Sequence, residues 1–203
     1  INYQIKNNIG VTMRYDSFYN KKEIRNGIDF NLINWIYNLG CTPHLIPNDL
    51  RYFEVLKKIK FTGFILSGGN DLNMKKTRTI MENKILNHSN KKDIPVLGIC
   101  HGMQLMNKFE GGKIKKVEKH VGKNHKLINI EENYPIEVNS FHDFSISRLG
   151  KNFKIISKSF DGETEAIKHN KYNWVGWMWH PERAKKFDKK LTLIAKKLFK
   201  VHI

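Results

Sequence analysis

Apolar segments and helical patterns alternate along the first half of the chain. Short apolar runs bounded by turn residues indicate buried strands, whereas apolar residues spaced three and four positions apart indicate amphipathic helices. By these criteria we expect strands at residues 9–13, 43–47, 62–66 and 95–99, and helices at 24–39, 77–86 and 103–109. Alternation of this kind predicts an α/β fold with a mainly parallel sheet and helices on both faces.

The second half of the chain has a different pattern, because its short β-strand segments are joined directly by turns. We expect strands at residues 114–117, 127–130, 136–139, 153–157, 165–168 and 174–179, and a final amphipathic helix at 188–199. No linker rich in glycine, serine or proline separates the two halves, and no internal repeat is visible. Residues 1–203 are therefore predicted to form a single domain.

The composition is that of a folded globular protein. Of the 203 residues, 40% are hydrophobic, which excludes a disordered chain, and no run approaches the roughly 18 apolar residues of a membrane span. Residues 1–8 are polar and lack the apolar core of a signal peptide. The two cysteines, Cys41 and Cys100, form neither a disulfide framework nor a Cys-x-x-Cys zinc motif. We therefore expect a cytoplasmic protein with both thiols free.

The net charge of +17 has a compositional origin in large part. Lysine accounts for 30 of the 36 basic residues and is scattered in pairs along the whole chain. Lysine, asparagine and isoleucine are all abundant, and all three can be encoded by A/T-only codons. The sequence shows no helix-turn-helix or RNA-recognition signature and no arginine cluster. We expect a small anionic substrate and no nucleic-acid partner; specific nucleic-acid binding would require affinity that persists near physiological salt.

The sharpest chemical feature is the segment Gly98-Ile99-Cys100-His101-Gly102, which follows an apolar strand and opens a helix. This is the context of a nucleophile elbow, in which the nucleophile sits on a tight strand-to-helix turn. Glycine two residues before and after the nucleophile removes clashes with the neighbouring chain. Cys100 at a helix N-terminus is favoured as a thiolate, and the following backbone N–H is placed to donate to an oxyanion.

A thiol nucleophile needs a base, and the base needs a group that orients it. The apolar strand at 174–179 runs directly into His180-Pro181-Glu182. Residues i and i+2 at a strand end point to the same side, so His180 and Glu182 are predicted to lie together. The carboxylate would hold one imidazole nitrogen while the other faces the thiol.

Two further segments carry weaker signals. Ser67-Gly68-Gly69-Asn70-Asp71 ends another predicted parallel strand, and its paired glycines allow backbone N–H groups to approach an oxyanion. His120 and His125 are five residues apart without a third ligand, a spacing seldom used for a metal. We therefore expect no metal site, and we interpret residues 110–127 as a loop over the pocket that places Lys123 near a substrate phosphate.

Together these segments resemble the class I glutamine amidotransferase superfamily. The resemblance covers nearly the whole chain and is carried by S-G-G-N-D at 67–71, P-V-L-G-I-C-H-G-M-Q at 95–104, V-N-S-F-H at 138–142, D-G-x-x-E-A-I at 161–167 and G-W-M-W-H-P-E at 176–182. Within the superfamily the chain is similar to stand-alone γ-glutamyl hydrolases, which have no fused synthetase domain. The resemblance implies a flavodoxin-like three-layer sandwich with a mainly parallel central sheet and a β-rich C-terminal half.

The resemblance also implies a role for each catalytic residue. Cys100 would attack the γ-carbonyl of a γ-glutamyl group. His180 would act as the base and then as the acid for the leaving amine, and Glu182 would orient His180. The backbone N–H groups of Gly69 and His101 would form the oxyanion hole.

Substrate-binding roles follow from the same resemblance. Gln104 would help to hold the glutamyl portion, together with His142 and the main chain of Asp143 and Phe144. Many γ-glutamyl hydrolases have His-Gln where this chain has Asp143-Phe144, and this difference indicates a different acceptor or leaving group. No cofactor is expected.

The expected reaction is hydrolysis of a γ-glutamyl amide or phosphoramidate bond through a glutamyl-thioester, with release of glutamate. The resemblance extends to enzymes of capsular polysaccharide modification whose substrate is a cytidine nucleotide with a γ-glutamyl phosphoramidate. Three alternatives are a glutaminase component that supplies ammonia to a separate synthase, a general γ-glutamyl peptide or polyamine hydrolase, and a non-catalytic binding protein. The presence of Cys100, His180 and Glu182 argues against the last.

Overall fold

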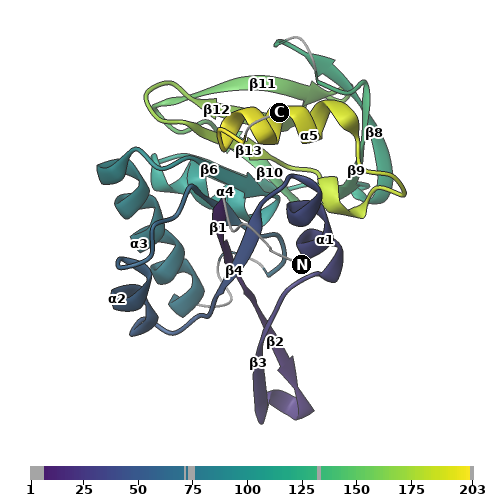
Figure 1. Cartoon of the computed structure of the whole chain (residues 1–203). Helices are drawn as coiled ribbons and strands as arrows, with labels where there is room; N and C mark the ends of the chain where they lie inside the picture. Colours follow the sequence, from purple (N-terminus) through teal and green to yellow (C-terminus); the bar gives the residue numbers. More distant parts are fainter. Residues whose placement is uncertain (1–6, 71, 73–75, 132–133, 202–203) are drawn as a thin grey trace.

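A mixed nine-stranded sheet forms the centre of the molecule in the computed structural model, which describes residues 7–70, 72, 76–131 and 134–201 (Figure 1). Five neighbouring strands run parallel, and the remaining four continue the sheet antiparallel. In order across the sheet, the strands are β4 (Thr42–Ile46), β1 (Asn8–Thr12), β5 (Gly63–Leu66), β6 (Val96–Ile99), β13 (Trp174–Trp177), β12 (Thr164–His169), β11 (Phe153–Ser159), β8 (Val121–Asn129) and β9 (Glu137–Phe141).

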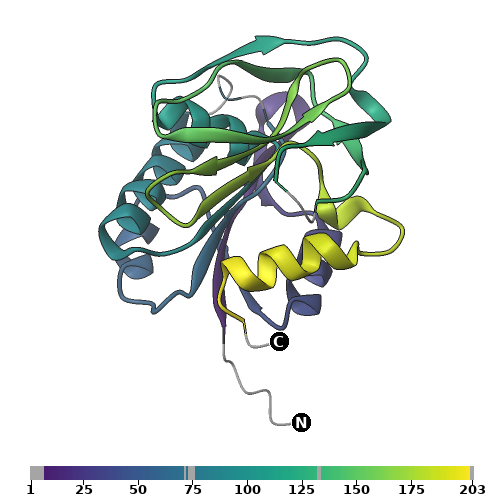
Figure 2. The ribbon, with the colours of Figure 1, turned by 90° about the horizontal axis from the view of Figure 1, so that it is seen from above.

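Helices cover both faces of the parallel half of the sheet (Figures 1 and 2). One face packs against α1 (Phe30–Asn38) and α5 (Lys189–Leu198), with Trp35 and Ala195 fully buried between them and the sheet. The other face packs against α2 (Tyr52–Leu56), α3 (Lys76–Lys92) and α4 (His101–Phe109) around a second apolar core. The predicted three-layer α/β sandwich with a β-rich C-terminal half is confirmed.

The prediction of one helix over residues 24–39 is wrong in its first part. Residues Glu23–Gly27 form β3, which pairs with β2 (Arg14–Phe18) across a short turn at Tyr19–Lys21 to make a projecting hairpin (Figure 1). The helix begins only at Phe30, because the Asp29 carboxylate accepts a hydrogen bond from the Asn31 N–H at 3.0 Å and caps it. Ile24 is 55% exposed, so its apolar character did not mark a buried helical face.

The predicted loop at residues 110–127 is also wrong. It contains β7 (Lys113–Lys116) and the first part of β8, which begins at Val121 and not near residue 127. β7 pairs with β10 (Phe144–Arg148), a strand that the sequence pattern did not predict, and β8 pairs with β9. Most side chains in the first part of β8 are exposed, so these residues carry no apolar run to mark a strand.

Other differences are smaller. The helix α2 was not predicted, α3 extends beyond the expected 77–86, and α4 begins two residues before the expected 103. The polar stretch at residues 1–6 and the last residue of the S-G-G-N-D segment, Asp71, lie outside the described residues.

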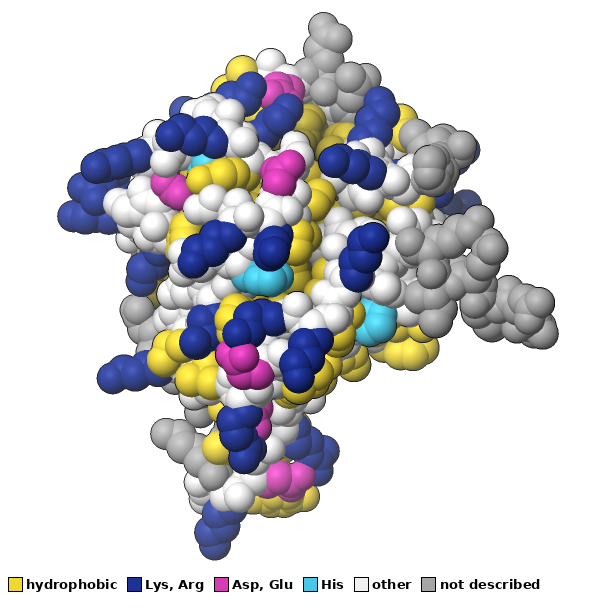
Figure 3. Space-filling view, turned by 60° about the vertical axis from the view of Figure 1, so that its left-hand side comes forward, with side chains coloured by type: hydrophobic (Ala, Val, Ile, Leu, Met, Phe, Trp, Pro, Cys, Tyr) yellow, Lys and Arg dark blue, Asp and Glu magenta, His cyan; other side chains and the backbone are white. Residues whose placement is uncertain are grey.

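Basic side chains are spread over the surface. On the face drawn in Figure 3, lysine and arginine side chains stand apart, with uncharged and hydrophobic surface between them and a few acidic side chains among them. Within the described part of the chain, no helix is long and apolar enough to cross a membrane.

Candidate active site

The carboxyl ends of four parallel strands bring the predicted site residues to one edge of the sheet. Because β1, β5, β6 and β13 are neighbours and run in the same direction, the segments that follow them must emerge side by side. Residue 67 follows β5, residue 100 follows β6, and residues 178–182 follow β13.

Cys100 occupies a strained turn between β6 and α4, as the elbow motif predicts. Its φ of 49° and ψ of −101° are unusual for a residue other than glycine. A Cβ on Gly102 would lie 2.2 Å from the Leu66 carbonyl oxygen, and one on Gly98 would lie 2.7 Å from the backbone of Gly102. The two flanking glycines are therefore required for the turn to fit against the neighbouring strand.

The imidazole of His180 connects the thiol to a carboxylate. Its side chain hydrogen-bonds with Cys100, and its Nδ1 lies 2.6 Å from Glu182 Oε1. Both His180 and Glu182 are buried. The backbone of His180 is held by Asn139, whose amide accepts from the His180 N–H at 2.9 Å and donates to its carbonyl at 2.7 Å.

The electrostatics of His180 favour its protonated form. Burial lowers the pKa of an imidazole, but the hydrogen bonds and negative charges of Cys100 and Glu182 outweigh this effect and raise the pKa of His180 to about 9. The thiol, imidazole and carboxylate are thus in the hydrogen-bonded series that nucleophilic catalysis by cysteine requires.

A cavity of about 200 Å³ opens beside Cys100 and His180. It also contains the other residues for which the sequence predicted an oxyanion or substrate role, together with three that it did not single out. The expected ones are Gly69, His101, Gln104, His142, Asp143 and Phe144, and the additional ones are Asn70, Phe141 and Arg183.

Gln104 fixes the backbone on the far side of this cavity. Its Nε2 donates to the Phe144 carbonyl at 3.1 Å, and the same carbonyl faces Nδ1 of His142 at 3.1 Å. The His142 imidazole is fully buried and its Nε2 lies 3.4 Å from Glu165 Oε1, so its polar atoms face into the protein. A direct substrate contact by the His142 ring stays a prediction.

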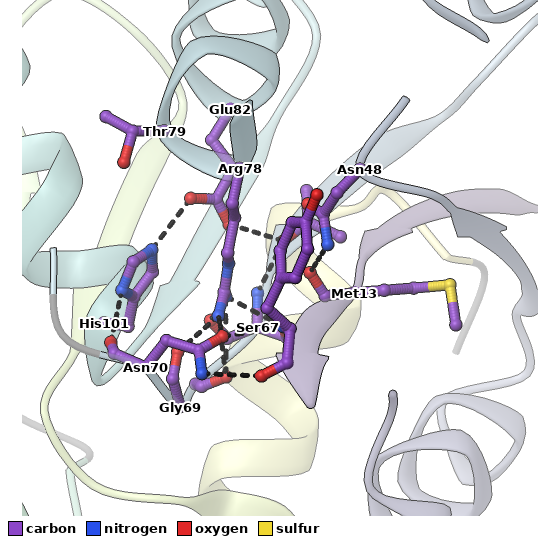
Figure 4. Close-up of polar contacts among 12 residues, drawn as sticks. Met13, Asn48, Ser67, Gly69, Asn70, Arg78, Thr79, Glu82 and His101 are labelled. Carbon is purple, nitrogen blue, oxygen red and sulfur yellow. Dashed lines mark hydrogen bonds and ion pairs between the residues drawn. The ribbon is translucent and has the colours of Figure 1, made fainter. Parts of the chain in front are cut away.

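A buried ionic network holds the segment 67–70 in place (Figure 4). The guanidinium of Arg78 donates to the carbonyls of Ser67, at 2.6 Å, and of Gly69, and its Nε donates to Glu82 Oε1 at 3.0 Å. Asn70 is held as well, because its carbonyl lies 2.8 Å from Nδ1 of His101. Together these contacts fix the loop that contains the expected oxyanion residue.

Glu82 is the centre of this network. Besides Arg78, it accepts a hydrogen bond from Thr12 Oγ1 at 2.8 Å, and its Oε2 lies 2.8 Å from Nε2 of His101 (Figure 4). Burial raises the pKa of a carboxyl, but the charges of Arg78 and His101 outweigh it and hold the pKa of Glu82 at about 2. The His101 side chain therefore joins the elbow to the oxyanion loop.

Sequence reasoning missed Arg78 and Glu82. Their only signal was an Arg-Glu pair four residues apart on a helix, and such pairs are usually solvent-exposed. Here both side chains are almost fully buried, at 1% and 0% exposed.

Lys123 does not line the catalytic cavity. It lies on β8 beside a separate surface hollow, with Lys119, Lys126 and Asp161. The basic residue that does reach the cavity is Arg183, whose guanidinium lies 4.9 Å over the ring of Phe141.

A second, larger hollow adjoins the catalytic cavity. It has a volume of about 580 Å³ and shares Phe141, His180 and Arg183 with the cavity. Lys185 and Lys186 also line it. A substrate that reaches Cys100 can therefore extend into a hollow with several basic side chains.

Comparison with known proteins places this site in a class. Residues 23–201 match the profile of the family described as glutamine amidotransferase class-I. A solved glutamine amidotransferase from Thermotoga maritima shares the fold, with a TM-score of 0.65, 16% identity, and coverage of 94% of this chain and 82% of that one. The chain belongs to the class I glutamine amidotransferase family, and it is an amide-hydrolysing enzyme.

Two curated relatives narrow the comparison. A γ-glutamyl-CDP-amidate hydrolase of Campylobacter jejuni subsp. jejuni serotype O:2 is 32% identical over 189 residues, which cover 86% of this chain and 90% of that protein. The glutamine-hydrolysing subunit of GMP synthase from Thermococcus kodakarensis is 34% identical over 156 residues, which cover 72% of this chain and 79% of that protein.

Proposed function

We propose that the protein is a cysteine hydrolase that cleaves a γ-glutamyl amide bond. The observation that carries this proposal is the hydrogen-bonded series of Cys100, His180 and Glu182 at one wall of the cavity. His180 takes the proton of the thiol, and the Cys100 sulfur attacks the γ-carbonyl carbon. When the C–N bond breaks, His180 gives the proton to the leaving nitrogen, and a glutamyl-thioester remains on Cys100.

Water completes the reaction. His180 takes a proton from a water molecule, whose oxygen attacks the thioester carbonyl. The C–S bond then breaks, the thiol of Cys100 regains the proton, and free glutamate leaves. Glu182 keeps the imidazole oriented in both steps through its contact with Nδ1.

The oxyanion of each tetrahedral intermediate is assigned to the backbone N–H groups of Gly69 and His101. Both residues line the cavity beside Cys100. The N–H of His101 lies at the start of α4, where the helix dipole also favours negative charge. The network around Glu82 supports this role, because it fixes the Gly69 carbonyl and the His101 ring at the same time.

The glutamyl portion is assigned to the side of the cavity formed by Gln104, His142, Asp143 and Phe144. The contact of Gln104 with the Phe144 carbonyl holds this wall in shape. The main chain of residues 143 and 144 would then meet the α-amino and α-carboxylate groups of the substrate.

We assign the leaving group to a nucleotide phosphoramidate, with γ-glutamyl-CDP-amidate as substrate and cytidine diphosphoramidate as product. The relative from Campylobacter jejuni is named for this substrate and covers most of the chain. The adjoining hollow supports the choice, because Arg183, Lys185 and Lys186 suit a diphosphate and the exposed ring of Phe141 suits a base. The product would serve capsular polysaccharide modification, in a cytoplasmic enzyme whose residues 1–203 act as one domain.

One second function is favoured by a specific observation. The similarity to the glutamine-hydrolysing subunit of GMP synthase supports a glutaminase that supplies ammonia to a synthase partner. The chemistry at Cys100 would be unchanged, and only the leaving group, ammonia, would differ.

The thioester is the test of the chemistry. The protein would be mixed with γ-glutamyl-CDP-amidate, quenched in acid and digested, and the peptide containing Cys100 would be weighed by mass spectrometry. We expect a glutamyl adduct on that peptide in the wild-type protein and no turnover in Cys100→Ala.

Cys41 provides the matched control. Burial raises the pKa of its thiol to about 11, so it should be unreactive, and Cys41→Ala should still form the adduct. Steady turnover by Cys100→Ala, with its fold checked by circular dichroism, would refute the mechanism.

A further inference from the structure

Three histidines and one glutamate from separate segments meet behind the glutamyl side of the cavity. His120 precedes β8, His125 lies on β8, His142 follows β9 and Glu165 lies on β12. The ring centroid of His120 is 4.3 Å from that of His125 and 4.8 Å from that of His142. Ligand atoms of His120, His142 and Glu165 all lie within 4.8 Å of one another.

Buried polar atoms in this cluster lack hydrogen-bond partners among the described residues. Glu165 is 0% exposed, and neither of its carboxylate oxygens accepts a hydrogen bond from this part of the chain. The nearby nitrogens are Nε2 of His142 at 3.4 Å and Nδ1 of His125 at 3.6 Å, both beyond ordinary hydrogen-bond length. A fully buried carboxylate in this state is costly unless a cation neutralises it.

Two of the histidines are held as metal ligands usually are. The Nδ1 of His142 faces the Phe144 carbonyl at 3.1 Å, and its Nε2 makes no hydrogen bond within the described ranges. The Nε2 of His120 lies 2.9 Å from Asp161 Oδ2, and the same holds for its Nδ1. Ligating histidines typically donate the other ring N–H to a carbonyl or carboxylate, which leaves the free nitrogen aimed at the metal.

We propose that this cluster binds a divalent transition-metal ion, with zinc as its ion. His120, His142 and Glu165 are the ligands, and His125 supplies the fourth. Zinc bonds of 2.0–2.1 Å in a tetrahedron place neighbouring ligand atoms about 3.3 Å apart. The separations of 3.4 Å and 3.6 Å from Glu165 match that spacing better than they match hydrogen bonds.

The site is structural in kind, because protein side chains fill all four positions. It would tie β8, β12 and the end of β9 together directly behind the wall of the catalytic cavity. The link to that wall is short, because the Phe144 carbonyl that orients His142 also accepts from Gln104. Asp161 is 58% exposed and marks the side from which an ion can enter.

Metal content tests the proposal without reference to activity. The whole chain would carry Cys100→Ala, so that the catalytic thiol cannot bind zinc. After treatment with a chelator and addition of Zn²⁺, we expect about one zinc ion per chain, measured by elemental mass spectrometry. Co²⁺ in its place should give the intense visible absorption of a tetrahedral site.

Glu165→Gln and His142→Gln should each lose the bound ion and the Co²⁺ spectrum. Asp161→Asn, an exposed change outside the ligand set, should weaken binding about 10–100-fold. The matched control is His169→Gln, because His169 is also buried with its Nε2 3.6 Å from a carboxylate oxygen, on Glu110, and lies outside the cluster. It should keep the zinc.

Two results would overturn the proposal. One is a wild-type chain that binds neither Zn²⁺ nor Co²⁺, which would make the cluster a set of histidinium–carboxylate pairs. The other is zinc that binds Asp161→Asn and the ligand variants as tightly as wild type. Both concern metal content alone, so they leave the proposed hydrolase function untouched.

Discussion

Cys100 has an unusual backbone conformation because the fold uses it as the turning point between a buried strand and a helix. A positive φ in a residue other than glycine costs about 1–3 kcal/mol and persists only where the surroundings impose it. Here the Cys100 N–H donates to the Trp177 carbonyl at 2.7 Å, and its carbonyl accepts from the Gln104 N–H at 3.0 Å. The nucleophile is thus fixed before any substrate arrives.

The charge on His180 is set by the same small group of residues. A pKa raised from 6.5 to about 9 means that the folded state favours the imidazolium. The stability that this interaction contributes is fully present below about pH 6.5 and is lost as the pH rises through about 9. Activity that depends on His180 as the acid for the leaving nitrogen should decline over the same alkaline range.

Glu182→Gln tests the source of that charge. Without the carboxylate, the pKa of His180 should fall towards 6.5, so the alkaline limb of kcat/KM should move from near pH 9 to lower pH. We also expect kcat to fall by about 10²-fold or more, because the imidazole loses its orienting partner. The measurement is a pH–rate profile of glutamate release.

The control for this change is Glu54→Gln, which removes an exposed carboxylate on α2 that forms an ion pair with Lys57. Its profile should match that of wild type. An alkaline limb that stays near pH 9 in Glu182→Gln would show that Glu182 does not set the charge of His180.

At the scale of elements, α3 positions the oxyanion loop from the back. Arg78 and Glu82 lie one turn apart on this helix and reach the loop after β5 and the first residue of α4. The helix therefore couples two strand ends that must keep a fixed separation for Gly69 and His101 to act together. Removing one member of a buried ion pair typically costs about 3–5 kcal/mol, so this link also stabilises the fold.

Arg78→Lys tests this coupling with the charge retained. One ammonium cannot donate to Ser67, Gly69 and Glu82 with the geometry of a guanidinium. We expect kcat to fall about 10²–10³-fold, as for loss of an oxyanion donor, with a much smaller change in KM. Steady-state kinetics with a thermal melt would separate this effect from unfolding.

Arg148→Lys is the matched control, because Arg148 donates to a loop carbonyl, that of Gly111, from an exposed position. It should keep the wild-type kcat. If Arg78→Lys is folded and also keeps it, the network is structural and has no part in positioning the loop.

The elements that the sequence predicted well are those buried on both faces. Every residue of β5 and β6 is buried, so each appears as an unbroken apolar run. The hairpin β2–β3 and the first part of β8 leave most of their side chains partly or fully exposed, so polar residues conceal them. Burial on two faces leaves a mark in the sequence, and burial on one face or none leaves a weaker one.

At the scale of the whole molecule, the site exists only because distant segments end at one sheet edge. Local spacing was enough to find Cys100, His180 and Glu182, since each motif is short and chemically distinct. It was not enough to find Arg78, Glu82 or the cluster around Glu165. Those groups are assembled by sheet order and helix packing, which spacing along the chain does not encode.

The charge of the molecule also becomes clearer at this scale. The net charge of +17 is dispersed over the surface, while a basic hollow adjoins the catalytic cavity. We therefore assign the excess positive charge to general attraction of anions, and specificity to Arg183, Lys185 and Lys186 at the edge of the site.

The most direct test of the central claim is glutamate release from three substrates, with Cys100→Ala as the control for each. The substrates are glutamine, a γ-glutamyl peptide and γ-glutamyl-CDP-amidate. We predict fast release from the nucleotide amidate, little from the other two, and none from the variant. Release from glutamine alone would contradict the assigned leaving group and favour an ammonia-donating role, and release that survives in Cys100→Ala would contradict the catalytic role of the thiol.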